Sequence, residues 1–305
     1  MTVVDCFSFH NELDLLRLRL RLLAPVVDQF LVIEACQTHS GLSKEPTLRN
    51  LLKAGDLGLE SAILQKLRVY TVEEFPNGLD HWGRERFQRD VALELINGQH
   101  GSPRDLHLLV CDLDELPNPD FIRQYRDKPN ANAMIPITMW LCYFKPNFVR
   151  IAGTDREWSG PFLTTFGLAT ANGSLSRLRE QARQRERFER KPLGRFQGWH
   201  LSYQGDEKFI SVKRQAFAHQ EDRVQKALIS VTDLIRDRRG PFDDPNAPPQ
   251  WAVLPIEGLG MPDLMTSDPF IRNRVITKPD NLGRLFLSQS PKEAHTWSLK
   301  KLFRS

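Results

Sequence analysis

The chain has 305 residues, of which 40% are hydrophobic and 26% are charged, with a formal net charge of +4. These proportions are ordinary for a soluble globular protein, and the length suggests one large or two modest domains. The mild positive charge is compatible with an anionic substrate but is too small to indicate nucleic acid binding. No stretch approaches 18 consecutive apolar residues, so we expect no transmembrane helix.

The N-terminus and the cysteines indicate a cellular compartment. Residues 1–7 lack the basic and apolar regions of a secretory signal. The four cysteines, Cys6, Cys36, Cys111 and Cys142, are far apart, and no pair has the spacing of metal ligands. We therefore expect reduced, mostly buried thiols in a cytoplasmic protein.

Predicted strands and helices alternate over the first 125 residues. Apolar runs typical of strands and patterns typical of helices follow one another, the strands at residues 3–9, 30–33, 66–72 and 106–111, and the helices at 13–23, 82–96 and from 119 onward. This order predicts an α/β sandwich with a mainly parallel sheet.

Two details of the predicted helices can be checked against a structure. Asn11 has the residue type and the position of an N-cap for the first helix, and Asn97 with Gly98 is expected to end the second. Arg17, Arg19 and Arg21 lie largely off the leucine stripe of the first helix. We expect these arginines to face solvent.

The middle of the chain has shorter apolar runs, at residues 133–137, 140–144, 148–152 and 162–166, which predict an antiparallel extension that shapes an acceptor cleft. Residues 174–191 predict a helix very rich in Arg and Glu, for which a solvated face is the default and phosphate or membrane contact the alternative. A strand at 198–203 and a helix at 224–236 follow. The basic stretch beyond about Lys278 is expected to be a tail.

The strand at residues 106–111 ends at three carboxylates, Asp112, Asp114 and Glu115. Ligands of α/β proteins bind at the carboxyl ends of such strands. Residues two apart on an extended backbone point the same way, so Asp112 and Asp114 are expected to share one side. Hard carboxylates suit Mg²⁺ or Mn²⁺, which usually also bind substrate phosphates. This segment therefore suggests an enzyme for a diphosphate-bearing substrate, and the alternative is a capped surface loop.

Six blocks resemble glycosyltransferase family 17, the family of β-1,4-mannosyl-glycoprotein 4-β-N-acetylglucosaminyltransferase. In chain order they are DCFSFHNE (5–12), FLVIE (30–34), WGRE with QR (82–85 and 88–89), DLDELP (112–117), GWHLS (198–202) and AHQE (218–221). The resemblance implies a GT-A-like fold over residues 1–277, with a nucleotide-binding half (1–125), an acceptor-side half (126–277) and a C-terminal tail (278–305). It also implies an inverting transferase that uses UDP-GlcNAc, a UDP-sugar donor, with Mn²⁺ or Mg²⁺.

Animal members of this family carry an N-terminal membrane anchor, whereas this sequence starts at its first predicted strand. We therefore expect a cytoplasmic enzyme, with peripheral contact at the inner face of the membrane as an alternative. The expected partners are a nucleotide sugar and a glycan or glycoconjugate acceptor, for which a cell-surface or secreted polysaccharide intermediate fits better than an N-glycan.

Within this resemblance, Asp114 is the expected direct metal ligand, Asp112 would bind ribose or a metal-bound water, and Glu115 would be a further or outer ligand. His200 is the expected late metal or diphosphate contact, because a late histidine often reaches the metal in GT-A folds. A packed strand histidine is the alternative for His200, and a loop cap is the alternative for Glu115.

Arg84 and Arg89 are candidates to clamp the diphosphate, because guanidinium groups bind phosphate oxygens well. Five residues apart on a helix, they point roughly 140° apart, which favours only one of them, Arg84. Asn11 and Glu34 follow the first two strands, where the nucleotide would lie. For Glu34, a ribose or sugar hydroxyl would satisfy an otherwise costly buried carboxylate.

A general base near the acceptor hydroxyl is needed for inversion. The candidates, in order, are Glu221, Glu157 and Asp155, each of which has a surface carboxylate as its alternative. Two other functions remain open at this point. A sugar nucleotidyltransferase would keep the metal site but normally has a glycine-rich loop where this chain has residues 7–12, and a non-catalytic nucleotide-sugar or carbohydrate-binding protein would not hydrolyse UDP-GlcNAc.

Overall fold

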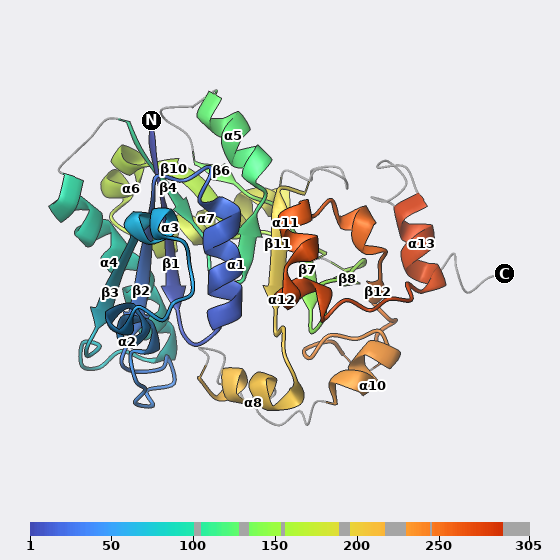
Figure 1. The fold of residues 1–305 in the computed structure, drawn as a ribbon. Helices are drawn as coiled ribbons and strands as arrows, with labels where there is room; N and C mark the ends of the chain where they lie inside the picture. Colours follow the sequence, from blue (N-terminus) through green and yellow to red (C-terminus); the bar gives the residue numbers. More distant parts are fainter. Residues whose placement is uncertain are drawn as a thin grey trace.

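The computed structural model describes residues 1–100, 105–127, 134–153, 156–188, 196–216, 230–244 and 246–288. Two six-stranded sheets lie side by side in the described chain, with helices around them (Figure 1). The first sheet is formed mainly by strands before residue 111, and all strands of the second sheet lie between residues 115 and 253. The predicted α/β class, with a mainly parallel sheet and an antiparallel extension, is confirmed.

The first sheet has the strand order β3-β2-β1-β4-β10-β6. Its strands are β1 (Thr2–Phe9), β2 (Gln29–Ala35), β3 (Leu67–Val72), β4 (Leu106–Val110), β6 (Ile135–Pro136) and β10 (Phe162–Thr165). The first four are parallel, and β10 runs antiparallel to β4. The carboxyl ends of β1, β2 and β4 therefore meet at one edge, where ligands of open α/β sheets bind.

Alternating side chains cover both faces of this sheet, as a two-residue period requires. On β1, Val4 and Cys6 pack in one cluster while Phe7 and Phe9 pack in the other. The second group joins the core beneath α1 (Leu13–Leu23), α2 (Thr47–Ala54) and α3 (Ser61–Lys66). The first group faces α4 (His81–His100), α6 (Phe166–Asn172) and α7 (Leu175–Phe188).

The second sheet has the strand order β12-β8-β7-β11-β5, with β9 paired to β7. Its strands are β5 (Glu115–Pro117), β7 (Met139–Tyr143), β8 (Phe148–Arg150), β9 (Glu157–Trp158), β11 (Gly198–Ser202) and β12 (Trp251–Val253). Only the β7–β11 pair is parallel. The remaining helices are α5 (Pro119–Asp127), α8 (Glu207–Ala216), α10 (Val231–Arg236), the 3₁₀ turn η1 (Ile256–Leu259), α11 (Asp263–Ser267), α12 (Pro269–Arg272) and α13 (Asn281–Ser288).

The two sheets meet where the chain passes from β4 to β5, and α1 lies at this junction (Figure 1). One core cluster contains leucines of α1, Leu109 of β4 and Trp199 of β11, so it belongs to both sheets. Helix α1 is buried around most of its circumference, since it packs on the first sheet and also against α11 and α12. The prediction that Arg19 faces solvent is therefore wrong: its side chain is fully buried.

The predicted helix boundaries need three corrections. The cap position of α1 is Glu12, which makes no side-chain cap bond, and the Asn11 Oδ1 atom is buried without a partner. Helix α4 continues through Asn97 and Gly98 to His100, so these residues do not end it. The expected tail is folded at its start, because α13 packs Leu282 and Phe286 into the core.

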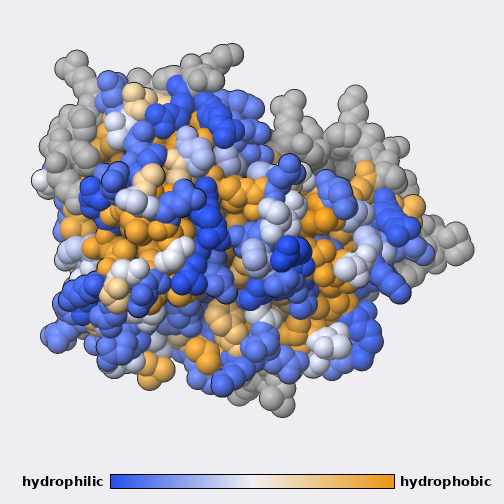
Figure 2. Space-filling model, viewed as in Figure 1, coloured by the Kyte–Doolittle hydropathy of each residue, from blue (hydrophilic) through white to orange (hydrophobic). Residues whose placement is uncertain are grey.

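The surface and the thiols show no unusual feature. Figure 2 shows mostly hydrophilic residues on this face, with hydrophobic residues in between, which is normal for a folded protein. All four cysteines are free thiols, and all but Cys36 are buried. Among the described helices, none combines the length and the apolar character needed to cross a bilayer.

Candidate active site

A pocket of about 250 Å³ lies at the carboxyl edge of the first sheet and opens toward the second. Its floor comes from the segments that follow β1, β2 and β4, and its far wall from β7, β9 and β11. Helices α4, α7 and α8 contribute basic residues to its lining, namely Arg89, Arg179 with Arg183, and Lys213. Parts of the chain distant in sequence therefore converge on the acidic segment after β4.

Asp112 binds two guanidinium groups at the pocket wall. Its Oδ1 atom accepts a hydrogen bond from Arg89 Nη2 at 3.1 Å, and its Oδ2 atom accepts one from Arg179 Nη2 at 2.8 Å. Burial alone would raise the pKa of Asp112, but the two arginines outweigh it and hold the pKa well below its usual range. Asp112 is therefore an anion at neutral pH.

Glu115 is fully buried behind Asp112, and both of its carboxylate oxygens accept hydrogen bonds from other groups of the protein. Arg179 donates to both carboxylate oxygens, at 2.5 and 2.9 Å. Trp158 Nε1 donates to Oε1 at 2.6 Å, and the backbone N–H of Asp112 donates to Oε2 at 2.6 Å. Glu115 thus anchors both Arg179 and Trp158 at the segment after β4.

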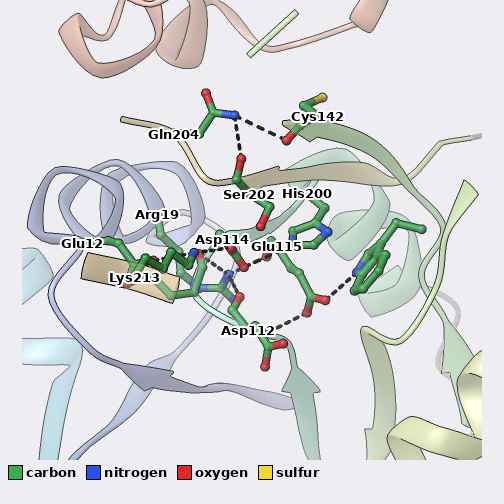
Figure 3. A network of polar contacts seen from close by, with 12 residues as sticks. Glu12, Arg19, Asp112, Asp114, Glu115, Cys142, His200, Ser202, Gln204 and Lys213 are labelled. Atoms are coloured by element: carbon green, nitrogen blue, oxygen red, sulfur yellow. Dashed lines mark hydrogen bonds and ion pairs between the residues drawn. The ribbon is translucent and has the colours of Figure 1, made fainter. Parts of the chain in front are cut away.

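Asp114 points to a different set of partners. Lys213 Nζ lies 2.9 Å from its Oδ2 atom and 2.7 Å from Glu12 Oε1, so the ammonium bridges two carboxylates. His200 Nε2 lies 3.4 Å from Asp114 Oδ1. The pKa of Asp114 is lowered well below its usual range, since Lys213 and His200 outweigh the effect of burial. Figure 3 shows Asp114 with Lys213 and His200, apart from the Asp112 carboxylate.

Arg19 fixes the backbone that carries these carboxylates. Its Nη1 atom donates to the carbonyls of Asp112 at 3.1 Å and Glu115 at 2.6 Å, and its other two nitrogens donate to both oxygens of Asp5. Both charged side chains are fully buried. The guanidinium fork on α1 thereby ties β1 to the turn between the two sheets.

The four predicted metal ligands do not form one cation site in this geometry. Asp112 faces Arg89 and Arg179, Glu115 is enclosed by its own donors, and Asp114 with His200 faces Lys213. Within the described residues, no group of three or more His, Cys, Asp or Glu side chains is arranged to hold a metal. These four residues as arranged therefore do not fit the Mn²⁺ or Mg²⁺ ion that the sequence resemblance implies.

The far wall of the pocket is aromatic. Trp158, Tyr143, Tyr203 and Phe242 line it. The His200 ring lies 4.3 Å from the Trp158 ring, and the Arg183 guanidinium lies 5.1 Å from the same ring on another side. Flat apolar faces with polar groups beside them are suited to a sugar ring.

The wall nearest β1 and β2 carries neutral histidines. Burial lowers the pKa of His10 to about 4 and also lowers the pKa of His39. His39 Nε2 lies 2.8 Å from Gln88 Oε1, and Gln88 Nε2 donates to the carbonyl of Ile33 at 2.7 Å. Gln88 therefore fixes the loop after β2 to the strand itself.

Comparison of the sequence with known protein families gives a match. The family model of glycosyltransferase family 17 matches residues 1–145, just under half of the chain. That segment contains β1, β2 and β4 and the acidic turn. Residues 1–145 are therefore similar to glycosyltransferase family 17. The protein thus carries a glycosyltransferase domain, in agreement with the sequence resemblance, and no curated protein matches the chain.

Three solved structures show distant similarity to this chain. The S. aureus TarS 1–349 structure has 14% identity and a TM-score of 0.35, over 56% of this chain and 49% of that one. The 4-diphosphocytidyl-2C-methyl-D-erythritol synthase structure has 10% identity and a TM-score of 0.38, over 74% of this chain and 96% of that one. The galactosyltransferase LgtC structure has 15% identity and a TM-score of 0.31, over 60% of this chain and 66% of that one. The chain thus spans about half the length of the TarS structure, and we draw no functional conclusion from these similarities.

Several residues predicted for the donor site have other surroundings. Both oxygens of Glu34 accept backbone N–H groups, from Leu48 and Arg49 at 3.0 Å each, so its buried carboxylate needs no sugar hydroxyl. Arg84 donates to the His39 carbonyl at 2.9 Å and does not line the pocket, whereas Arg89 does. Asn11 lies outside this pocket as well.

None of the three residues predicted as general base is found in the pocket among the described residues. Asp155 and Glu221 fall outside the described residues. Glu157 precedes Trp158 on β9, and neighbouring strand residues point to opposite faces. Since Trp158 lines the pocket, Glu157 points away from it, and Arg156 Nη2 lies 3.3 Å from its carboxylate.

The sequence reasoning named Arg89 but missed Arg179, Lys213 and Glu12. Arg179 lies on the predicted arginine-rich helix, where a solvated face was the expectation, yet its side chain is only 7% exposed. Lys213 comes 99 residues after Asp114, on α8. Glu12 belongs to a family block, but it was given no role of its own. For Arg179, the signal in the sequence is the arginine-rich helix itself, for which phosphate contact is the alternative to a solvated face.

Proposed function

We propose that this protein transfers a sugar, N-acetylglucosamine from UDP-GlcNAc, to a hydroxyl of a glycan or glycoconjugate with inversion. One observation carries the proposal: Arg89, Arg179 and Lys213 converge on the acidic turn at the carboxyl edge of the family 17 domain. The family match supports a nucleotide-sugar donor. The choice of UDP-GlcNAc rests on the residue resemblance.

The three cations suit the chemistry of the leaving group. When UDP departs, negative charge grows on the diphosphate, and fixed positive groups stabilise that charge in a pocket shielded from water. Arginine forks bind phosphate oxygens in pairs, and an ammonium acts as a point charge. Each cation is now paired with a carboxylate, and each lines the pocket where phosphates would enter.

The aromatic wall suits the acceptor. Trp158 and Tyr143 offer flat faces opposite the cations, and Ser202 adds a hydroxyl. We assign His200 as the general base, because its Nε2 atom faces Asp114 while its Nδ1 atom has no hydrogen-bond partner. A carboxylate that binds one imidazole nitrogen orients the other toward a substrate proton.

Calorimetric titration of UDP, UDP-GlcNAc, UDP-glucose and UDP-galactose tests the donor assignment. We expect UDP to bind to the wild type and Arg179→Met to weaken binding roughly ten- to a hundredfold, the value of one charge-assisted contact pair. Arg177→Met is the matched control, since Arg177 is exposed on the same helix. Circular dichroism verifies that each variant is folded.

The outcomes separate the open functions. UDP-GlcNAc binding tighter than that of the other sugars, with slow release of UDP in the absence of acceptor, supports the transferase. Binding without any turnover would favour a carbohydrate-binding protein, and failure of every uridine nucleotide to bind would exclude the proposed donor. An acceptor screen with bacterial polysaccharide intermediates, and cell fractionation for the predicted cytoplasmic location, then follow.

A further inference from the structure

We propose that the Lys213 ammonium takes the place of a divalent cation in this pocket, so that donor binding needs no metal. The inference rests on the proposed function and specifies how its diphosphate site is charged. It departs from the Mn²⁺ or Mg²⁺ that the resemblance implies. The reason is that the acidic side chains at this pocket already have cationic partners from the chain itself.

The position of Lys213 carries the argument. Its Nζ atom lies between Asp114 Oδ2 at 2.9 Å and Glu12 Oε1 at 2.7 Å, and its side chain is only 7% exposed. The Tyr203 ring lies 5.5 Å from Nζ on another side. A divalent ion bound to Asp114 in this arrangement would have to displace the ammonium or approach within a few ångströms of it, and like charges that close repel strongly.

The neighbouring carboxylates offer no alternative metal position. Both oxygens of Asp112 are held by arginines, and both oxygens of Glu115 accept several donors. Mg²⁺ and Mn²⁺ prefer oxygen ligands, and Mg²⁺ usually takes one or two protein carboxylates, whose oxygens must be open to the ion. Asp112 and Asp114 point to separate cations instead. Two acids in a D-x-D spacing thus serve to fix arginine and lysine side chains.

Charge supports the same conclusion. Burial alone would lower the pKa of Lys213, but Asp114 and Glu12 outweigh burial and hold it above its ordinary value, so Lys213 is a permanent cation. With Lys44, Arg89, Arg179 and Arg183, five cationic side chains line the pocket, against the four carboxylates of Glu12, Glu85, Asp112 and Asp114.

The test measures UDP binding by calorimetry to protein treated with EDTA and to the same protein with MnCl₂. We expect the wild type to bind UDP equally in both, and MnCl₂ alone to give no stoichiometric binding. Lys213→Met, which removes the charge and retains much of the length, should weaken metal-free binding about tenfold or more. Lys208→Met, at an exposed position on the same helix, should bind like the wild type.

A second readout separates a charge role from a structural one. Lys213→Met leaves Glu12, Asp114 and His200 without their cation, so MnCl₂ should restore part of the UDP affinity in this variant. A wild type that needs Mn²⁺ to bind UDP would overturn the inference and leave the proposed function intact. Metal-free UDP binding by Lys213→Met as tight as that of the wild type would also overturn it. No UDP binding under any condition would reject both.

Discussion

His10 shows at the residue scale how the pocket affects stability. Burial lowers its pKa to about 4; Glu12 opposes this shift, whereas Lys44, His39 and Lys213 add to it. In the unfolded chain a histidine titrates near 6.5, so between these values the unfolded state binds more protons. The contribution of His10 to stability is therefore present above about pH 6.5 and decreases as the pH falls toward 4.

We expect the free energy of unfolding to fall by about 1–3 kcal/mol over this interval through His10. The variant His10→Gln cannot titrate, so its urea unfolding curves at pH 7 and pH 5 should differ less than those of the wild type. His81→Gln, at the start of α4, is the matched control. The same pH dependence in His10→Gln and in the wild type would contradict this account.

The acidic residues of the site and Arg89 could be predicted as site residues, whereas the partners Arg179 and Lys213 could not. Asp112 and Asp114 follow an apolar strand, and that local pattern placed them at a pocket. Arg179 and Lys213 lie 67 and 99 residues away from these partners. No local pattern encodes such pairings, because they arise when α7 and α8 pack around the sheet edge.

At the scale of elements, helix α2 receives its N-terminal cap from a neighbouring strand. Its N-cap position is Pro46, which has no side-chain oxygen, and no side chain of its own segment caps it. Glu34, at the end of β2, supplies the cap from outside by accepting the N–H groups of Leu48 and Arg49. A carboxylate at this end also opposes the positive end of the helix dipole.

We expect Glu34→Gln to lower the free energy of unfolding by about 1–3 kcal/mol, because the amide keeps one acceptor and places a donor against a backbone N–H. UDP affinity should change little if the protein remains folded. Glu45→Gln, exposed just before α2, is the control and should leave the stability near that of the wild type. Loss of UDP binding in a stable Glu34→Gln protein would instead support the nucleotide role predicted from the sequence.

Strong periodic signals predicted β1, β2, β4, α1 and α4, whereas the short helices α2 and α3 were not predicted. Short elements were harder. β5 has only three residues, directly after the acidic turn, and its pairing with β11 is not a local property. Likewise, a run that read as one more short strand, β10, joins the first sheet antiparallel to β4, and only tertiary packing decides this.

At the scale of the whole molecule, the site lies where two sheets share one core. The segment between β4 and β5 contains Asp112 and Asp114, and α1 packs in the core that both sheets share. The sequence pattern of α1 shows a leucine stripe but does not show that a second layer covers the opposite side. Arg19 was consequently assigned to solvent, although it is the residue that joins β1 to the turn.

Arg19→Met should therefore lower the free energy of unfolding of the whole protein by about 3–5 kcal/mol, because Asp5 would remain buried without a partner. The carbonyls of Asp112 and Glu115 would also lose their donor, so UDP affinity should fall as well. Adding Asp5→Asn should recover part of the stability but not the UDP affinity, since the turn stays unsupported. Arg17→Met, whose side chain is 27% exposed, is the matched control and should cost about 1 kcal/mol or less. Urea unfolding of the four proteins decides the matter: equal losses for Arg19→Met and Arg17→Met would mean that the buried fork does not hold the two sheets together.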